Sequence, residues 1–305
     1  MSDEPRYVLV VAHTGRAESL HAALTVLDLL LDSDVVPVLT DWERSDLGAA
    51  SERARTIAVL GQDVRIEELE LVVVLGGDGT ILRGAEIVRG TAVPILGVNL
   101  GHVGFLAEAE REDLRDTITR VIARDWDVEE RMTLEVVVLQ DSAVVHRNWA
   151  LNEATVEKAS RERMLEVVME VDGRPLSSFG CDGIVVSTPT GSTAYAFSAG
   201  GPIVWPTLDA MLFVPLSAHA LFARPLVVPP TSVVAVELLR RTDGTGVLWC
   251  DGRRMFDLTV GARVEVRASS VPVRLARLHS ASDRFTDRLV RKFDLPVAGW
   301  RGPAT

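Results

Sequence analysis

The sequence has very little cysteine and almost no lysine. Cys181 and Cys250 are too few for a disulfide framework or a zinc cluster, and such scarcity is typical of a reducing compartment. Each precedes Asp-Gly, so we interpret both as small buried hydrophobic residues before turns and not as reactive thiols. Lys158 and Lys292 are the only lysines, so arginine carries nearly all the positive charge.

Long hydrophobic runs are also missing. The longest apolar stretches, such as residues 71–75, are far below the ~18 residues that span a bilayer. Residues 1–6 are acidic overall and lead straight into a predicted strand, which is unlike a signal or transit peptide. We therefore expect a cytoplasmic protein that has no membrane partner.

The net charge of −11 and the pI of about 5.1 predict a surface that repels nucleic acid and anionic membranes. An anionic substrate must then be held locally by helix N-termini, backbone amides, Arg83 or a metal. A length of 305 residues predicts two domains. The content of 47% hydrophobic and 25% charged residues is ordinary for a globular enzyme.

The common nucleotide-binding motifs are absent from the sequence. No G-x-x-x-x-G-K-[ST] occurs, and the spacing of Gly97, Gly101 and Gly104 does not fit G-x-G-x-x-G. Neither standard nucleotide-binding fold is indicated.

The first 130 residues alternate strand and helix patterns. Apolar runs predict four strands, at 7–12, 35–39, 71–75 and 93–98. Helical spacing of apolar residues predicts helices over 16–31 and 112–124 and a weaker one over 51–60. This alternation predicts a parallel sheet covered by helices on both faces, whose ligands bind beyond the strand C-termini.

After Arg131 the pattern changes to short, valine-rich runs separated by turn signals. They predict nine strands, at 132–139, 144–149, 164–171, 184–187, 211–215, 232–239, 246–250, 263–267 and 271–275. Residues 282–293 predict a terminal helix. We expect a parallel α/β domain over 1–130, an all-β, sandwich-like domain over 131–278, and a helix and tail over 279–305. We expect the helix to pack back on the N-terminal domain, with packing on the second domain as the alternative.

A glycine turn with an embedded carboxylate follows the predicted strand 71–75. It reads Gly76-Gly77-Asp78-Gly79-Thr80 and leads into a predicted helix. Glycine lets the backbone approach a ligand, and a helix N-terminus directs N–H groups at phosphate. Bound phosphate would repel the Asp78 carboxylate unless this group accepted a proton or bound a metal. Its presence therefore favours phosphoryl transfer. An ordinary tight turn is the alternative.

Hydroxyl side chains crowd a second segment, from Ser187 to Tyr195, which continues to Pro202. Such side chains can hydrogen-bond a ribose or an adenine edge without adding charge. Serine and threonine also gather in surface turns, but this segment is nearly free of charge and follows a strand. We therefore predict that it is at least half buried.

Together these segments resemble the NAD kinase family, from about residue 7 to 290. The resemblance rests on the glycine turn, on Gly101-His102-Val103-Gly104-Phe105-Leu106, on Leu151-Asn152-Glu153, and on the segment from Asp182-Gly183 through Tyr195 to Gly201. The glycine turn is shared with 6-phosphofructokinases and with lipid kinases, whereas the other segments are more specific. The resemblance implies transfer of the γ-phosphoryl group of ATP to the 2′-hydroxyl of the adenosine ribose of NAD.

The resemblance also implies roles for residues of the glycine turn. Asp78 would orient the ribose hydroxyl and accept its proton. Gly76, Gly77, Gly79 and Thr80 would hold phosphate through their backbone. Arg83, one turn into the helix, would reach the same anion, with an exposed helical arginine as the alternative.

In the dinucleotide-binding part, Asn152 would bond adenine or ribose, and Glu153 would bind a ribose hydroxyl. Further implied contacts come from Asp182, Thr190, Thr193, Ala194, Tyr195, Ala196, Phe197 and Ser198. Arg163 matches a basic position but also reads as a solvated residue. Phe105 reads better as a core residue than as an adenine contact, and His219 better as a loop histidine, although it lies with Arg224 in a family motif.

The resemblance implies Mg²⁺ carried by ATP, since no carboxylate cluster has metal-ligand spacing, and implies a homodimer or homotetramer. Polyphosphate use stays open. Gly180 lies where some members carry arginine, so NADH is an expected second substrate. The alternatives are a lipid or sugar-phosphate kinase of the same superfamily and a dinucleotide sensor without turnover.

Overall fold

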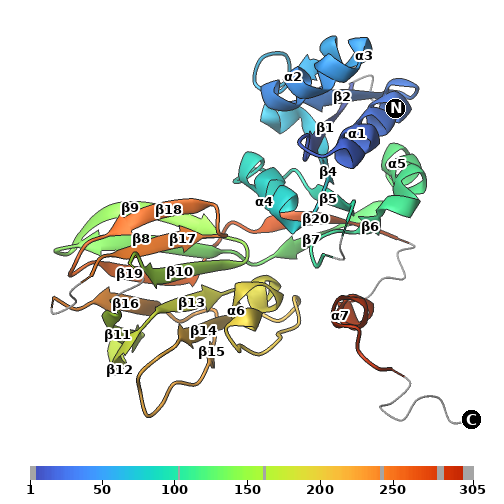
Figure 1. Cartoon of the computed structure of the whole chain (residues 1–305). Coiled ribbons are helices and arrows are strands. Elements are labelled where there is room, and N and C mark those ends of the chain that lie inside the picture. The colour runs from blue at the N-terminus through green and yellow to red at the C-terminus, as the bar shows by residue number, and fades with distance from the viewer. Residues whose placement is uncertain (1–4, 102–103, 161–162, 241–243, 280–284, 298–305) are drawn as a thin grey trace, which may run out of the picture. The chain divides into compact units, whose positions relative to one another are not determined.

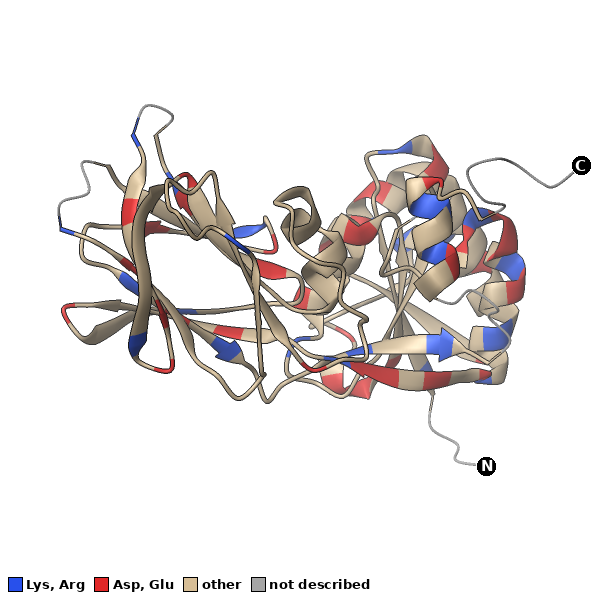
Figure 2. Ribbon diagram, turned by 90° about the horizontal axis from the view of Figure 1, so that it is seen from below, with Lys and Arg blue, Asp and Glu red and all other residues tan. Residues whose placement is uncertain are grey.

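The computed structural model describes residues 5–101, 104–160, 163–240, 244–279 and 285–297. The chain divides into two units, one formed by residues 1–130 and 274–305 and the other by residues 131–273 (Figure 1). Acidic and basic residues are interspersed along the strands and helices of both units (Figure 2). No helix in the described part of the chain has the length and hydropathy to cross a membrane.

The first unit is a mostly parallel sheet with helices around it. Its strand order is β3 (Ala58–Val59), β2 (Val35–Leu39), β1 (Arg6–Ala12), β4 (Leu69–Leu75), β5 (Ile95–Asn99), β20 (Val273–Leu278) and β7 (Trp126–Arg131), with β6 (Ala109–Glu110) paired to β5. Its helices are α1 (Ala17–Leu31), α2 (Asp41–Ala50), α3 (Glu52–Arg55), α4 (Asp78–Ile87), α5 (Leu114–Ala123) and α7 (Phe285–Phe293), with short 3₁₀ turns at Ile66–Glu68 and Arg111–Asp113.

Helices cover both faces of this sheet. Successive residues of a strand point to opposite sides, so the apolar strands present a hydrophobic surface on each face. Leu75 and Leu96 pack in one core with apolar residues of α1 and α5. On the other face, α4 lies so close to β4 that a Cβ at Gly84 would come within 2.7 Å of Val74 Cγ2. The predicted parallel α/β sheet is confirmed.

The helix predicted over residues 51–60 was wrong in position. The structure has α2 earlier, at Asp41–Ala50, whereas 51–60 contains only the short α3 and β3. The Thr40 hydroxyl accepts the backbone N–H of Glu43 at 3.4 Å and caps α2. This Thr-x-x-Glu spacing is a helix start signal that outweighs the weak apolar pattern after it.

The strand predicted over 271–275 belongs to the other unit. It forms β20, whose Leu275 pairs in parallel with Ile95 of β5. The second unit therefore ends at residue 273, and not at the predicted 278. A valine-rich run predicts a strand but does not identify its partner.

The second unit consists of two antiparallel sheets. One has the order β15 (Leu226–Val228), β14 (Met211–Leu216), β13 (Gly183–Ser187), β10 (Glu153–Lys158), β17 (Gly246–Cys250) and β18 (Arg254–Leu258). The other has β12 (Arg174–Cys181), β11 (Leu165–Val171), β16 (Val234–Leu238), β19 (Arg263–Ala268), β8 (Leu134–Gln140) and β9 (Ala143–Ala150). Apolar residues of both sheets share one core, which confirms the sandwich-like domain.

Both cysteines lie inside this core. Burial raises the pKa of the Cys181 and Cys250 thiols to about 12, so both stay protonated at neutral pH. Their interpretation as buried hydrophobic residues agrees with this environment. Seven strands were not predicted from the sequence. β7, β10, β12 and β18 contain charged or polar residues that weaken the apolar signal, whereas β3, β6 and β15 have only two or three residues each.

Candidate active site

The glycine turn lies at the C-terminal edge of the parallel sheet. β4 ends at Leu75 and α4 begins at Asp78. Gly76 must be glycine, because a Cβ there would lie 2.5 Å from Thr80 Oγ1. Among the described residues, and leaving aside chain neighbours and the backbone of α4, a Cβ at Gly77 or Gly79 would meet no atom within 4 Å. Packing among these residues therefore does not require the two glycines, and the open space beside them leaves room for a ligand to approach the helix N-terminus closely.

Two backbone N–H groups fix the carboxylate of Asp78. Phe105 N–H donates to Oδ2 and Leu106 N–H donates to Oδ1, each at 3.2 Å. A Cβ at Gly104 would come within 2.4 Å of Oδ1, so glycine allows the carboxylate to lie on this segment. The structure thus holds a partly buried carboxylate in one orientation at the start of α4.

Arg83 is engaged inside the first unit. Its Nη2 donates to the carbonyl of Ala12 at 2.7 Å and to Glu43 Oε1 at 2.5 Å. The Glu43 side chain is only 1% exposed, so it requires this cation. Phosphate binding by Arg83 stays a prediction that has no support from these contacts.

Phe105 packs against α7. Its ring centroid lies 5.8 Å from that of Phe285 and 6.0 Å from that of Phe293. These contacts favour the core role that the sequence left as the better alternative to stacking on adenine.

In the second unit, Glu153 begins β10, Asn152 directly precedes it, and both are held by Asp251. The Asp251 carboxylate accepts the N–H groups of Leu151 at 3.0 Å and of Asn152 at 2.7 Å. It also accepts a hydrogen bond at 2.6 Å from Arg254, whose guanidinium lies 4.3 Å from the centre of the Trp149 ring. Asp251 therefore fixes the backbone that presents the Asn-Glu pair.

The hydroxyl segment packs directly on Asn152. The backbone carbonyl of Asn152 accepts a hydrogen bond from the N–H of Thr188 at 2.9 Å. A Cβ at Gly191 would lie 2.1 Å from the same carbonyl oxygen. The hydroxyls of Ser187, Thr188 and Ser192 donate to backbone carbonyls. These three hydroxyls are thus used within the fold, and all three residues are fully buried, which agrees with the predicted burial of the segment and not with a surface turn.

The remaining predicted residues of this segment differ in exposure. Thr190 is buried, Thr193 and Ala194 are half-buried, and Tyr195, Phe197 and Ser198 are exposed at the short helix α6 (Tyr195–Ser198). Ala196 is fully buried against Val185 and Leu212, so its side chain serves the core. The exposed and half-buried members remain candidates for ligand contact.

Glu153 is an almost fully buried carboxylic acid. Burial and the nearby charge of Asp251 raise its pKa to about 8, although the N–H of Tyr195 donates to its Oε2 at 3.4 Å. Burial also raises the pKa of Asp251, but the backbone donors and Arg254 oppose that shift. With a pKa of about 8, Glu153 is mostly protonated at neutral pH, and a protonated carboxyl both donates and accepts hydrogen bonds.

This shift predicts a pH-dependent stability that Glu153→Gln removes. The pKa is about 8 in the folded chain against an ordinary value of 4.5, so between these values the native state binds more protons than the unfolded state. Stability should therefore fall as the pH rises from about 4.5 to 8. Urea unfolding at pH 5.5 and 8 should show a smaller decrease for the glutamine variant, and equal decreases would contradict the assignment.

The other predicted residues lie on the surface of the second unit. Lys158 Nζ contacts Asp182 Oδ1 at 2.5 Å, and this hydrogen bond lowers the pKa of Asp182. Arg163 and Arg224 are exposed. His219 is exposed and its N–H donates to the carbonyl of Gly180 at 2.8 Å. His102 and Val103 lie outside the described residues.

Three residues that shape the two sites were not predicted from the sequence. Asp251 was interpreted only as part of a turn. The Cys-Asp-Gly sequence that occurs at both Asp182 and Asp251 was the one signal that could have drawn attention to it. Gly104 and Gly191 were part of the quoted motifs, but no sequence pattern shows that they pack on Asp78 and Asn152. Within the described ranges, no group of three or more His, Cys, Asp or Glu side chains is arranged to hold a metal.

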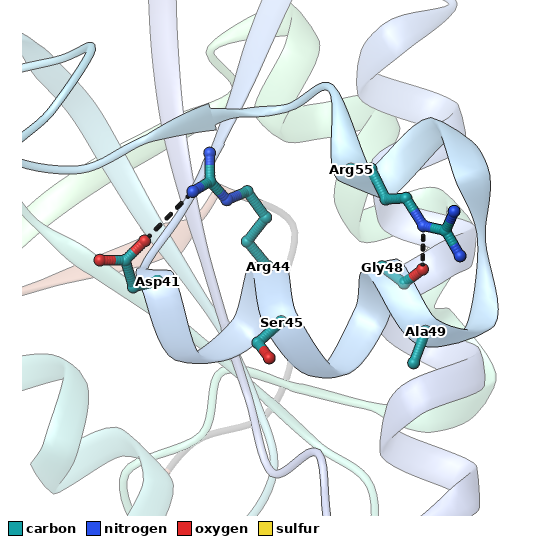
Figure 3. Close-up of a pocket in the computed structure, with 6 residues that line it drawn as sticks. All are labelled: Asp41, Arg44, Ser45, Gly48, Ala49 and Arg55. Carbon is teal, nitrogen blue, oxygen red and sulfur yellow. Dashed lines mark hydrogen bonds and ion pairs between the residues drawn. The ribbon is translucent and has the colours of Figure 1, made fainter.

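A hollow of about 490 Å³ lies elsewhere in the first unit, along α2 and at Arg55 of α3 (Figure 3). It is lined by Asp41, Arg44, Ser45, Gly48, Ala49 and Arg55. Arg44 pairs with Asp41 at 3.3 Å, and Arg55 donates to the Gly48 carbonyl at 2.7 Å. None of the predicted site residues lines this hollow.

Both units match families of known proteins. Models of the ATP-NAD kinase N-terminal domain and C-terminal domain match residues 8–126 and 151–278. The NAD kinase of Leifsonia xyli is 66% identical over 298 residues, covering 98% of this chain and 97% of the relative. NAD kinase 2 of Streptomyces coelicolor is 58% identical over 299 residues, with 97% of each chain covered.

Two solved structures are also similar. The crystal structure of yeast NADH kinase complexed with NADH has a TM-score of 0.85 at 22% identity, covering 98% of this chain and 90% of that one, and it supports the fold. That of an NAD kinase from Archaeoglobus fulgidus in complex with ATP has a TM-score of 0.69 at 25% identity, covering 95% and 100%. With both domains matched and relatives above half identity over nearly the full length, the chain belongs to the NAD kinase family.

Proposed function

We propose that the protein transfers the γ-phosphoryl group of ATP to the 2′-hydroxyl of the adenosine ribose of NAD, giving NADP and ADP. The observation that carries this proposal is the carboxylate of Asp78, oriented by Phe105 and Leu106 at the start of α4 beside two glycines that internal packing does not require. Family membership supports the choice of substrates.

In this reaction the ribose oxygen forms a bond to the γ-phosphorus, and the bond from that phosphorus to the β–γ bridging oxygen breaks. Asp78 would accept the hydroxyl proton, a role worth ~10²–10⁴ in rate. The N-terminus of α4 would stabilise the phosphoryl oxygens. Asn152 and Glu153 would bind the adenosine portion of NAD.

Magnesium would neutralise charge on the ATP phosphates and so assist the transfer. The donor set fits an ion carried mainly by the nucleotide. Each oxygen of Asp78 accepts one N–H group and keeps a lone pair, so this carboxylate could still act as one ligand of the ion.

Incubation with NAD, ATP and magnesium tests this function, with an NADP-specific dehydrogenase as the detector. We expect NADP to form with one ADP per turnover. Binding of NAD without turnover would instead identify a sensor, and phosphorylation of only a lipid or a sugar phosphate would identify another kinase of the superfamily.

Asn152→Ala should mainly raise the KM for NAD, by about tenfold, while kcat changes little. The asparagine side chain would bond the bound adenosine equally in the ground and transition states, and its loss would leave the rate of the chemical step unchanged. Initial rates over a range of NAD concentrations measure both constants. An unchanged KM would remove Asn152 from the site.

We also propose that NADH is a substrate and that Gly180→Arg suppresses its use selectively. Gly180 pairs with Glu166 in the register of β12 and β11, and a Cβ there would make only ordinary contacts, at 3.4 Å, with Glu166 and Met164. The first side-chain atom is therefore accommodated, and the test uses a Gly180→Arg variant that is verified to be folded. A cation there should interact differently with the charged oxidised ring and the neutral reduced ring. Rates with NAD and NADH decide the matter: a wild type inert toward NADH, or equal losses in the variant, would contradict it.

The assembly and location are further parts of the proposal. We propose a cytoplasmic homodimer or homotetramer, which native mass measured with and without NAD tests. Replacement of ATP by polyphosphate in the same coupled assay determines whether polyphosphate is a second donor.

A further inference from the structure

We infer that Arg288, on the C-terminal helix α7, is a positioning residue for Asp78. It acts through the segment Gly104–Leu106, whose N–H groups hold the Asp78 carboxylate. The inference rests on the proposed function, since it assigns Arg288 an effect on the proton acceptor of that reaction.

The same residue of this segment contacts both Asp78 and Arg288. Phe105 donates its N–H to Asp78 Oδ2 at 3.2 Å and accepts a hydrogen bond on its carbonyl from Arg288 Nη1 at 3.1 Å. Arg288 is only 6% exposed, so a shift of its guanidinium would leave a buried charge without its hydrogen-bond partners. Arg288 and Asp78 are thus joined through one residue.

A buried carboxylate anchors the other side of Arg288. Arg288 Nη2 contacts Glu108 Oε2 at 3.3 Å, and Arg277 Nη1 contacts the same oxygen at 2.7 Å. The N–H of Leu278 donates to Glu108 Oε1 at 3.0 Å, and the N–H of Glu108 donates to the carbonyl of Gly97 at 2.7 Å. Glu108 is thereby fixed to β5 and β20, and it holds Arg288 in place.

The aromatic contacts of Phe105 with Phe285 and Phe293 tie the same segment to both ends of α7. Residues 104–107 belong to no helix or strand. Side-chain contacts, and not the hydrogen bonds of a helix or sheet, therefore hold this segment in one conformation. A displacement of a catalytic group by about 1 Å can cost ~10² in rate. Loosening this segment should therefore lower the rate of the chemical step.

Arg288→Gln tests the inference, with Arg291→Gln as the matched control. Arg291 lies on the same helix, is exposed, and approaches Glu110 at 3.9 Å. We expect Arg288→Gln to lower kcat at least tenfold with the KM for NAD within twofold, and Arg288→Lys, which keeps the charge, to recover part of the loss. Hydrogen exchange at Phe105 and Leu106 should be faster in Arg288→Gln and unchanged in Arg291→Gln.

Combination with Asp78→Asn gives the decisive comparison. If Arg288 acts through Asp78, Arg288→Gln should lower kcat less than twofold further in that background. Additive losses would overturn the inference, as would unchanged exchange at Phe105 and Leu106. If Arg288→Gln does not fold, Arg288→Lys carries the same two measurements. A wild type that forms no NADP would contradict the proposed function instead, whereas the exchange result does not depend on activity.

Discussion

Asp78→Asn should lower kcat by at least ~10² while the KM for NAD stays within a few-fold of the wild type. The asparagine side chain has nearly the same shape but cannot accept the ribose proton. It can keep only one of the two N–H contacts from Phe105 and Leu106, because its NH₂ group faces the other donor. Steady-state rates of NADP formation at saturating ATP measure both constants.

Asp116→Asn is the matched control for this substitution. It removes an exposed carboxylate on α5 that pairs with Arg120 at 2.8 Å, and kcat should then change less than twofold. A loss below tenfold in Asp78→Asn would show that Asp78 is not the proton acceptor.

Gly191→Ala should abolish most NAD binding and lower the free energy of unfolding by about 3 kcal/mol or more. The new Cβ would lie 2.1 Å from the Asn152 carbonyl oxygen and 2.6 Å from its Cα, and this backbone is fixed by Asp251 and Thr188. Overpacking against backbone costs at least as much as the ~1–3 kcal/mol seen for side chains. Urea unfolding and the KM for NAD measure the two effects.

Gly180→Ala serves as the control for stability, because both changes add one methyl group to the second unit. At Gly180 the nearest atoms to the new Cβ are side-chain atoms at 3.4 Å, so the unfolding midpoint should stay close to that of the wild type. Equal stability of the two alanine variants would show that the hydroxyl segment does not press on Asn152.

Local patterns in the sequence were sufficient for much of the fold. β2 and β17 have the predicted bounds, and α1 begins one residue later than predicted. The position of Asp78 at a strand-to-helix turn also follows from local residues, since glycine and an apolar run specify that geometry directly. Such features depend on neighbours in the chain and need no knowledge of distant contacts.

What could not be predicted depends on partners far apart in the sequence. Arg83 looked available for phosphate because its partner Glu43 lies 40 residues away and is buried only in the folded unit. Asp251 holds the N–H of Asn152 across 99 residues, and Arg288 reaches Phe105 across 183. The identity of a residue does not reveal which distant group will take its hydrogen bond.

The insertion of β20 between β5 and β7 sets the order in which the chain can mature during synthesis. Residues 131–273 form a continuous unit that can fold as soon as they leave the ribosome, whereas the first sheet lacks one of its inner strands until residues 273–278 are made. Its closing contacts span 170 residues or more, which makes them slow to form. We therefore expect the earlier part of the sequence to reach its native form last, and the Asp78 carboxylate to acquire its fixed orientation only when translation is almost complete.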